Sequence, residues 1–308
     1  MSALRSALED YLALRRSMGF KLDRAGHLLV QFVAHCEAAG SGTVTTQLAL
    51  SWATLPTGGS QSWHAARLSV VRGFARYLAL LDERTEVPPR DLLPNRSHRA
   101  CPYLYSTEEV VALMDAAGKL PSPLRRATFS TLIGLLHVTG MRIGEVLHLD
   151  RDDVDLAQQV IVVRDSKFRK SREVPIHQST VRALGDYARQ RDELCRRTSS
   201  PTFFISLAGT RLLYCNFHLC FQGLAREAGL VARSATCRPR PHDLRHTFAV
   251  STLIDWYRAG VQVEPRMARL STYLGHIHPA HTYWYLEAAP ELLGLAAARL
   301  EANTEPEA

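Results

Sequence analysis

The stretch Gly275-His-Ile-His-Pro-Ala-His-Thr-Tyr-Trp-Tyr-Leu-Glu287 (GHIHPAHTYWYLE) holds three histidines and two tyrosines close together. We expect a helix after Pro279. In a helix, residues two apart point about 200° away from each other, so Tyr283 and Tyr285 cannot serve the same site. His281 and Tyr285 are four residues apart and share a face. The spacing therefore predicts that Tyr285 lies on the histidine-bearing face and that Tyr283 points away from it.

The histidines of this stretch do not have the spacing of a metal site. His276, His278 and His281 lack the H-E-x-x-H pattern and have no carboxylate among them, which disfavours zinc. A buried core helix explains Tyr283 and Trp284 but not the polar face opposite them. The sequence therefore favours a helix with one polar, functional face, on which Tyr283 and Trp284 are packing side chains.

The composition is moderately basic. The 308 residues include 37 Lys and Arg against 30 Asp and Glu, a net charge of +7. This surplus favours polyanionic partners, although ordinary solubility explains it equally well. The six cysteines contain no C-x-x-C pair, and Cys237 with His242 has no second close pair, so we expect reduced thiols rather than zinc. With no signal peptide and no membrane-length apolar run, the expected location is cytoplasmic.

The first part of the chain has the apolar spacing of helices. Apolar residues recur at helical intervals over residues 3–81, and Gly- or Pro-containing breaks fall at residue 19, at 40–42 and at 56–60. Three breaks separate four helices. Residues 1–83 are therefore predicted to form a four-helix domain.

The rest of the chain divides into a linker and a second domain. Residues 84–104 contain four prolines and four arginines, which predicts an extended basic linker. Ser106-Thr-Glu-Glu109 is a capping box that opens the second domain, 105–308. In it we expect helices over about 123–138, 179–197, 215–228, 241–258 and 263–275, and strands over about 160–163 and 173–176. The predicted fold is mainly α with a small β-sheet.

The segment Thr139-Gly-Met-Arg-Ile-Gly-Glu-Val-Leu-His-Leu149 is the first candidate for chemistry. Gly140 ends one helix and Arg142 opens the next. An arginine beside the free N–H groups of a helix start suits a phosphate. An arginine that caps a neighbouring carbonyl or pairs with Glu145 explains the same residues.

The segment Pro241-His-Asp-Leu-Arg-His246 is the second candidate for chemistry. Pro241 fits the first helical position, and His242 and Arg245 then lie three apart on one face. A proton carrier beside a fixed cation suits phosphoryl transfer, although a surface pair is the simpler explanation. His246 is interpreted as structural.

A basic turn between the two predicted strands is the third candidate for chemistry. A lysine in this turn can reach a leaving oxygen and donate its proton to it. The same charges are also explained by a hairpin tip that is simply exposed to solvent. The turn, SKFRKSREVPI over residues 166–176, contains Lys167, Arg169, Lys170 and Arg172.

The order of these motifs resembles the tyrosine recombinases, also called phage integrases. The resemblance is specific over residues 139–287; over the first hundred residues it rests on architecture, since the family commonly has a helical core-binding domain there. It implies an N-terminal core-binding domain followed by an α+β catalytic domain. The matching positions are Arg142, Lys167, His242, Arg245, His276 and Tyr285.

The resemblance implies that DNA is cut without hydrolysis. Tyr285 would attack the scissile phosphate, form a 3′-phosphotyrosyl bond and free a 5′-hydroxyl, with no metal or cofactor. Arg142 and Arg245 would bind the non-bridging oxygens, and His276 would donate a further hydrogen bond. His242 would assist proton transfer at the nucleophile.

The hairpin departs from the family at one position. Lys167 would protonate the leaving 5′-oxygen. The family often has glycine directly after this lysine, whereas Phe168 stands here, so a turn with positive φ is less favoured. Lys170 therefore stays open as an alternative acid.

The resemblance also implies the partners. These are double-stranded DNA and further copies of the chain, as a tetramer on paired sites, with accessory proteins left open. The run TYWYLEAAPELLGLA, residues 282–296, is similar to recombinases of transposons and integrative elements. The amphipathic tail, 290–300, can dock on a neighbouring copy or on its own domain.

Three other functions fit part of the sequence. A type IB topoisomerase uses the same chemistry as a monomer, but the chain's small size and separate helical domain favour recombination. A non-catalytic DNA-binding relative is disfavoured because all six residue types are present. A metal-dependent nuclease would lose activity on chelation.

Overall fold

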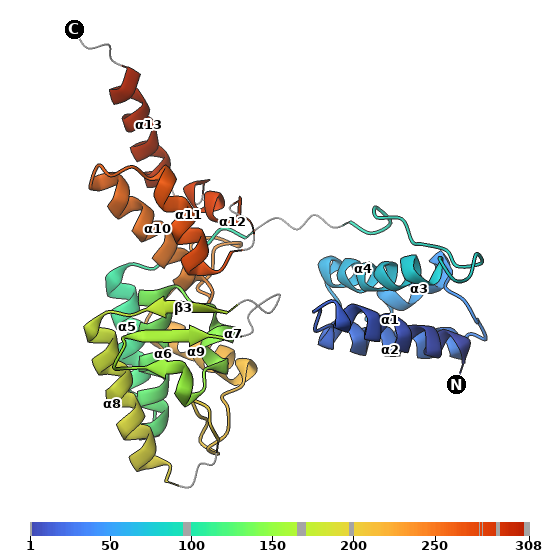
Figure 1. Cartoon of the computed structure of the whole chain (residues 1–308), viewed down its shortest axis with the longest axis horizontal. Helices are drawn as coiled ribbons and strands as arrows, with labels where there is room; N and C mark the ends of the chain where they lie inside the picture. Colours follow the sequence, from blue (N-terminus) through green and yellow to red (C-terminus); the bar gives the residue numbers. More distant parts are fainter. Residues whose placement is uncertain are drawn as a thin grey trace. The chain divides into compact units, whose positions relative to one another are not determined.

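The chain forms two compact units. The computed structural model describes residues 2–94, 100–164, 171–196, 200–276, 278, 280–287 and 290–304. Its N-terminal unit spans Met1–Arg99 and its C-terminal unit Ala100–Ala308 (Figure 1).

The N-terminal unit is the predicted four-helix module. Side-chain oxygens of Ser2, Thr45 and Ser60 accept backbone N–H groups at the starts of α1, α3 and α4. The apolar faces close on a core that includes Phe32 and Phe74, both fully buried. The helices are α1 (Ala3–Ser17), α2 (Asp23–Ala38), α3 (Thr46–Thr54) and α4 (Gln61–Leu78).

The first half of the predicted linker lies on this unit. The guanidinium of Arg72 donates from Nε to the carbonyl of Pro88 and from Nη2 to that of Pro89, both at 2.7 Å. The backbone N–H of Glu86 donates to the carbonyl of Val44 at 2.8 Å. These prolines therefore belong to the surface of the helical unit.

The C-terminal unit is mainly helical with one small sheet, as predicted. Helix α10 begins at Asp243, so Pro241 stands just before it rather than at its first position. None of the described helices is long and apolar enough to cross a membrane. The helices are α5 (Thr107–Gly118), α6 (Pro123–Thr139), α7 (Ile143–His148), α8 (Gln178–Leu194), α9 (Tyr214–Glu227), α10 (Asp243–Arg258), α11 (Glu264–Leu274), α12 (Ala280–Glu287) and α13 (Pro290–Thr304).

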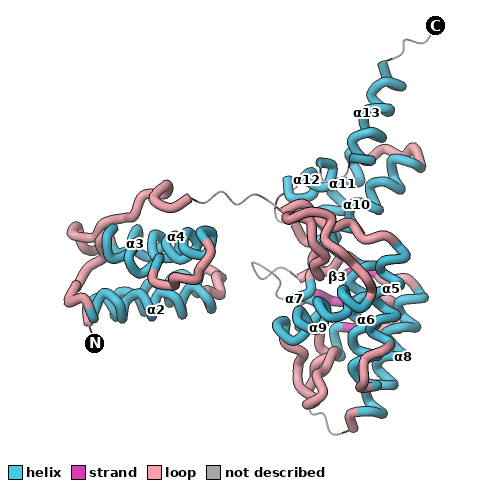
Figure 2. Tube along the Cα trace, turned by 180° about the vertical axis from the view of Figure 1, so that it is seen from behind, coloured by secondary structure: helices cyan, strands magenta, loops and turns pink. Residues whose placement is uncertain are grey.

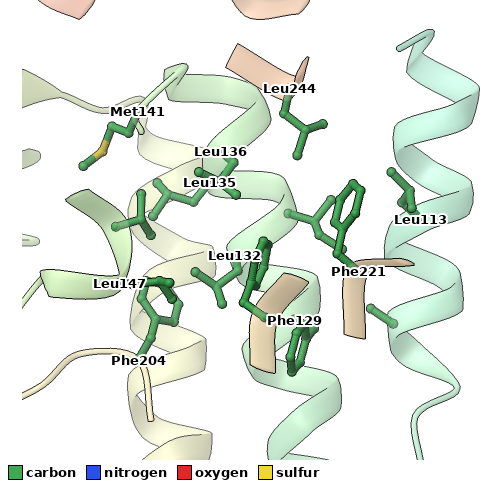
Figure 3. Close-up of a cluster of buried hydrophobic side chains, with 14 of the residues drawn as sticks. Leu113, Phe129, Leu132, Leu135, Leu136, Met141, Leu147, Phe204, Phe221 and Leu244 are labelled. Atoms are coloured by element: carbon green, nitrogen blue, oxygen red, sulfur yellow. The ribbon is translucent and has the colours of Figure 1, made fainter. Parts of the chain in front are cut away.

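Helix α6 runs through the middle of this unit. It contacts α5, α7, α8 and α10. Figure 3 shows Phe129, Leu132 and Leu136 among side chains of neighbouring elements, including Leu113 of α5 and Phe221 of α9. Because α6 is held on several sides, its C-terminal end at Thr139 is a fixed point for the motif that follows.

The sheet is antiparallel, in the order β1 (Val154–Asp155), β2 (Val160–Val163), β3 (Arg172–Pro175). β3 begins one residue earlier than predicted, and its first residue, Arg172, pairs with Val163 at the end of β2. β1 and a preceding short 3₁₀ turn were not predicted because two or three residues show no periodicity.

The C-terminal tail packs on its own unit. In Figures 1 and 2, α13 follows α12 beside α10. Leu292 is 1% exposed in a core shared with α10 and α11. Arg258 pairs with Glu291 at 2.6 Å, and Arg299 donates to the carbonyl of Val261 at 2.8 Å. In the single chain, the contacts of α13 are with its own unit.

The anchoring of α13 predicts a contrast between adjacent leucines. Leu292→Ala should lower the free energy of unfolding of the C-terminal unit by about 2–4 kcal/mol, because it leaves a cavity in a packed core. Leu293→Ala, at a position that is 54% exposed, should change it by less than about 0.5 kcal/mol. Urea unfolding of both variants checks this. Equal effects would mean that α13 does not pack here in solution.

Candidate active site

Arg142 stands at the start of α7 with its guanidinium held on two sides. Its Nη1 donates to Oε1 of Glu145 at 2.7 Å, and its Nη2 donates to the carbonyl of Gly275 at 2.9 Å. Its backbone N–H donates to Oε2 of Glu145 at 3.0 Å. The side chain is 32% exposed, so it is both fixed and open to a ligand.

Glu145 is the buried partner of two arginines. Arg172, at the start of β3, donates from Nη1 and Nη2 to the two oxygens of this carboxylate at 3.0 and 2.8 Å. Burial by itself would raise the pKa of Glu145, but the hydrogen bonds and charges of Arg172 and Arg142 outweigh it and lower the pKa to about 2. The carboxylate is therefore ionised at neutral pH and binds both cations.

Arg245 is held by backbone carbonyls. Its Nη1 donates to Gly140 and its Nη2 to Leu274, both at 2.7 Å, and the side chain is 2% exposed. Burial lowers the pKa of Arg245 to about 10, while the nearby phenol of Tyr285 acts in the opposite direction. Arg245 therefore remains charged at neutral pH.

Gly140 is required where it stands. Its φ of +58° is in the left-handed region, and a Cβ there would lie 2.5 Å from the ring of Phe248. No side chain fits without displacing that ring. The glycine thus lets its own carbonyl reach Arg245.

His276 follows the glycine that ends α11. Its Nδ1 lies 2.7 Å from the hydroxyl of Thr282, a fully buried residue of α12. When Thr282 donates this bond, the neutral ring carries its proton on Nε2, which becomes the free donor. Burial, and then the charges of Arg245 and Arg142, lower the pKa of His276 to about 3.

The two tyrosines of α12 face opposite ways, as the helical spacing predicts. Tyr285 is 2% exposed, and its ring centroid lies 5.9 Å from that of His276 and 5.5 Å from that of His246. Tyr283 is 50% exposed, so its prediction as a packing residue was wrong: it projects from the helix into solvent. Trp284 does pack, against the ring of His246.

His242 stands directly before α10, at the end of the helix that carries Arg245. Partial loss of hydration, and then the charges of Arg245 and Arg142, lower the pKa of His242 to about 4. Its ring centroid lies 4.8 Å from that of His246, which in turn contacts Tyr285. His246 thus packs between two candidate residues, consistent with its structural interpretation.

The structure brings five of the six predicted residues into one cluster. These are Arg142, His242, Arg245, His276 and Tyr285. Lys167, together with Phe168, Arg169 and Lys170, lies outside the described residues. Within the described part of the chain, no group of three His, Cys, Asp or Glu side chains could hold a metal ion.

Sequence reasoning missed several residues of this cluster. Glu145 stands three residues after Arg142, where the sequence predicts no more than an ion pair. Arg172 was grouped with the hairpin charges, and nothing in the sequence links Thr282 to His276. Their roles depend on contacts between segments that are distant in the chain.

Comparison with known proteins decides the family. The model of the phage integrase family matches residues 104–291. This chain belongs to the phage integrase family. It is 44% identical to y4rB of Sinorhizobium fredii, named as an integrase/recombinase, over 99% of both chains. It is 32% identical to the tyrosine recombinase XerD of Mycobacterium leprae, over 61% of this chain and 60% of that one.

A solved structure shares the fold. The Tn1549 transposon integrase, in complex with transposon right-end DNA, superimposes with a TM-score of 0.65 at 18% identity, covering 98% of this chain and 99% of that one. The predicted class, with a small sheet in a mainly helical recombinase, is thereby confirmed. The chain is a site-specific recombinase of the tyrosine type, an enzyme that breaks and rejoins DNA strands.

The lowered histidine pKa values predict how stability depends on pH. Unfolded histidine titrates near 6.5, whereas folded His276 and His242 resist protonation down to about 3 and 4. The unfolded chain therefore binds more protons as pH falls below about 6.5, and the free energy of unfolding should decrease from there toward pH 4, by at most about 1.4 kcal/mol per pH unit for each histidine.

His276→Asn should flatten this decrease, because one of the two titrating groups is gone. Denaturant unfolding at several pH values between 7 and 4 measures the slope for both proteins. Parallel slopes for the variant and the wild type would contradict the lowered pKa of His276.

Proposed function

We propose that this recombinase cuts DNA with Tyr285 as its nucleophile. The single observation that supports this most is the placement of its ring beside His276 and close to Arg245, while Tyr283 projects into solvent. A nucleophile must share its site with the groups that bind the phosphate, and Tyr285 meets this condition.

The proposed reaction has two matched transfers. The Tyr285 oxygen, on losing its proton, attacks the scissile phosphorus; the bond from phosphorus to the 5′-oxygen breaks, and a 3′-phosphotyrosyl bond and a free 5′-hydroxyl result. A 5′-hydroxyl, from the same duplex or its partner, then attacks that bond and releases Tyr285. Each step exchanges one phosphate ester for another, so neither ATP nor a metal ion is needed.

Arg142, Arg245 and His276 are proposed to bind the non-bridging oxygens. A guanidinium has five N–H donors, and two side-chain donors of each arginine bind Glu145 or backbone carbonyls among the described residues. The remaining donors are available for the charge that builds on the phosphate, with Nε2 of His276 as a further donor.

Two proton carriers complete the proposal. Lys167 would protonate the leaving 5′-oxygen, with Lys170 as the alternative that Phe168 leaves open. His242, neutral because of its lowered pKa, would accept the proton of Tyr285 either directly or through water.

The proposed substrate is a pair of double-stranded DNA sites. Exchange between two duplexes cuts four strands, and one nucleophile per chain then requires four copies, so a tetramer is the expected assembly. The N-terminal unit would act as the core-binding domain, with the predicted basic linker helping to hold the phosphate backbone. Similarity to an integrase/recombinase and to the fold of a transposon integrase supports a role in a mobile element. The expected location remains the cytoplasm.

The two tyrosines provide a matched test. On a nicked duplex that traps the covalent intermediate, Tyr285→Phe should give no protein–DNA adduct, while its DNA affinity should change by less than about 1 kcal/mol, since only one hydroxyl is lost. Tyr283→Phe should form the adduct as the wild type does. Denaturing electrophoresis and peptide mapping measure both.

The same assay run in excess EDTA separates this proposal from a metal-dependent nuclease. The adduct should form equally well with and without the chelator. An adduct retained by Tyr285→Phe or mapped to Tyr283 would contradict the assignment, and cleavage abolished by EDTA would contradict the mechanism.

A further inference from the structure

Arg172 joins three separate elements of the catalytic unit. It begins β3, its Nε donates to the carbonyl of Tyr273 in α11 at 2.8 Å, and both Nη atoms donate to Glu145 in α7. Its side chain is 12% exposed. A surface arginine that merely adds charge would not direct all three guanidinium nitrogens to buried acceptors.

The carboxylate of Glu145 is saturated as a result. Oε1 accepts from Arg172 and from Arg142 Nη1, and Oε2 accepts from Arg172 and from the Arg142 backbone N–H. A carboxylate offers about four acceptor positions, so none remains. The Arg142 guanidinium therefore makes a single contact with Glu145, and its Nη2 binds Gly275 instead.

Without Arg172, the hydrogen bonds of the Arg142 guanidinium to Glu145 and Gly275 would change. The planar fork of Arg142 matches the two oxygens of a carboxylate, so it would be free to turn and bind Glu145 through two parallel hydrogen bonds. The charge would also change: two guanidinium groups and one carboxylate leave one net positive charge, whereas Arg142 and Glu145 alone leave none. A phosphate would then meet a neutral pair.

Arg172 also packs against the turn before His276. A Cβ on Gly275 would lie 2.8 Å from Nη1 of Arg172, and the φ of Gly275 is +68°. Glycine is thus needed for both the backbone angle and the close approach. The Arg172 contact to Tyr273 holds the last turn of α11, directly before this glycine.

We propose that Arg172 is a positioning residue for DNA cleavage: by occupying both oxygens of Glu145, it leaves Arg142 available to the scissile phosphate and holds the Gly275–His276 turn beside it. This inference rests on the proposed function, because it assigns Arg142 and His276 to the phosphate.

The test compares two variants in the nicked-duplex assay. Arg172→Met should slow adduct formation by about 100-fold, the loss typical for one misplaced donor to a reacting oxyanion, with DNA affinity within about threefold of wild type. Arg172→Met combined with Glu145→Gln should recover at least about tenfold of that loss, because no carboxylate remains to capture Arg142. A merely structural role would not produce this recovery.

Two further variants serve as controls. Arg172→Lys should recover little, since one ammonium cannot replace three directed donors. Arg189→Met removes an exposed arginine that pairs with Asp186 on α8, and should cleave as the wild type does. Circular dichroism establishes that each variant is folded.

The outcomes separate the two proposals. If the wild type forms no adduct, the proposed function fails. If the wild type reacts but Arg172→Met equals it, or the double variant is no faster than Arg172→Met, the inference about Arg172 is overturned. If Arg172→Met does not fold, Arg172→Lys decides: wild-type cleavage by that variant would overturn the inference, and a folded but slow variant would support it.

Discussion

The buried carboxylate of Glu145 is the contact on which the rest of the site depends. A single buried charge is strongly unfavourable, and here it is stabilised by four hydrogen bonds from two arginines. Those arginines come from the start of α7 and the start of β3. The ion cluster therefore fixes the sheet against the helix that carries Arg142, and removing either cation would leave the carboxylate under-compensated.

Two glycine carbonyls provide the second set of anchors. Gly140 binds Arg245 and Gly275 binds Arg142, and both glycines have positive φ where a side chain would clash. Each arginine is thus oriented by backbone that cannot easily shift. Such preorganisation matters because donors that are already in place need no rearrangement when charge develops on the phosphate.

The aromatic cluster sets the position of Tyr285, the proposed nucleophile. The Tyr285 ring lies against His276 and His246, and His246 also contacts His242. The phenol is therefore held by packing against α10 and α11, close to Arg245 of α10. Because the pKa values of His242 and His276 are lowered, both rings are neutral at pH 7 and add no positive charge to that of the arginines.

Much of this could be predicted from local patterns. Helical spacing predicted the four-helix unit and the opposite directions of Tyr283 and Tyr285, and the order of motifs identified the candidate residues. The contact of Arg172 with Tyr273 joins residues 101 apart, and such pairs leave no periodic signal. The exposure of Tyr283 was also missed, because helical geometry gives the direction of a side chain but not whether protein or solvent lies in that direction.

The most direct test of the account is a crystal structure of the protein with duplex DNA and vanadate, which mimics the phosphoryl transition state. The account predicts vanadium bonded to the Tyr285 oxygen, with its oxygens about 2.7–3.1 Å from Arg142, Arg245 and His276, and with Arg172 still on Glu145. Vanadate bound away from Tyr285, or Arg172 released from Glu145 to bind it, would contradict the account.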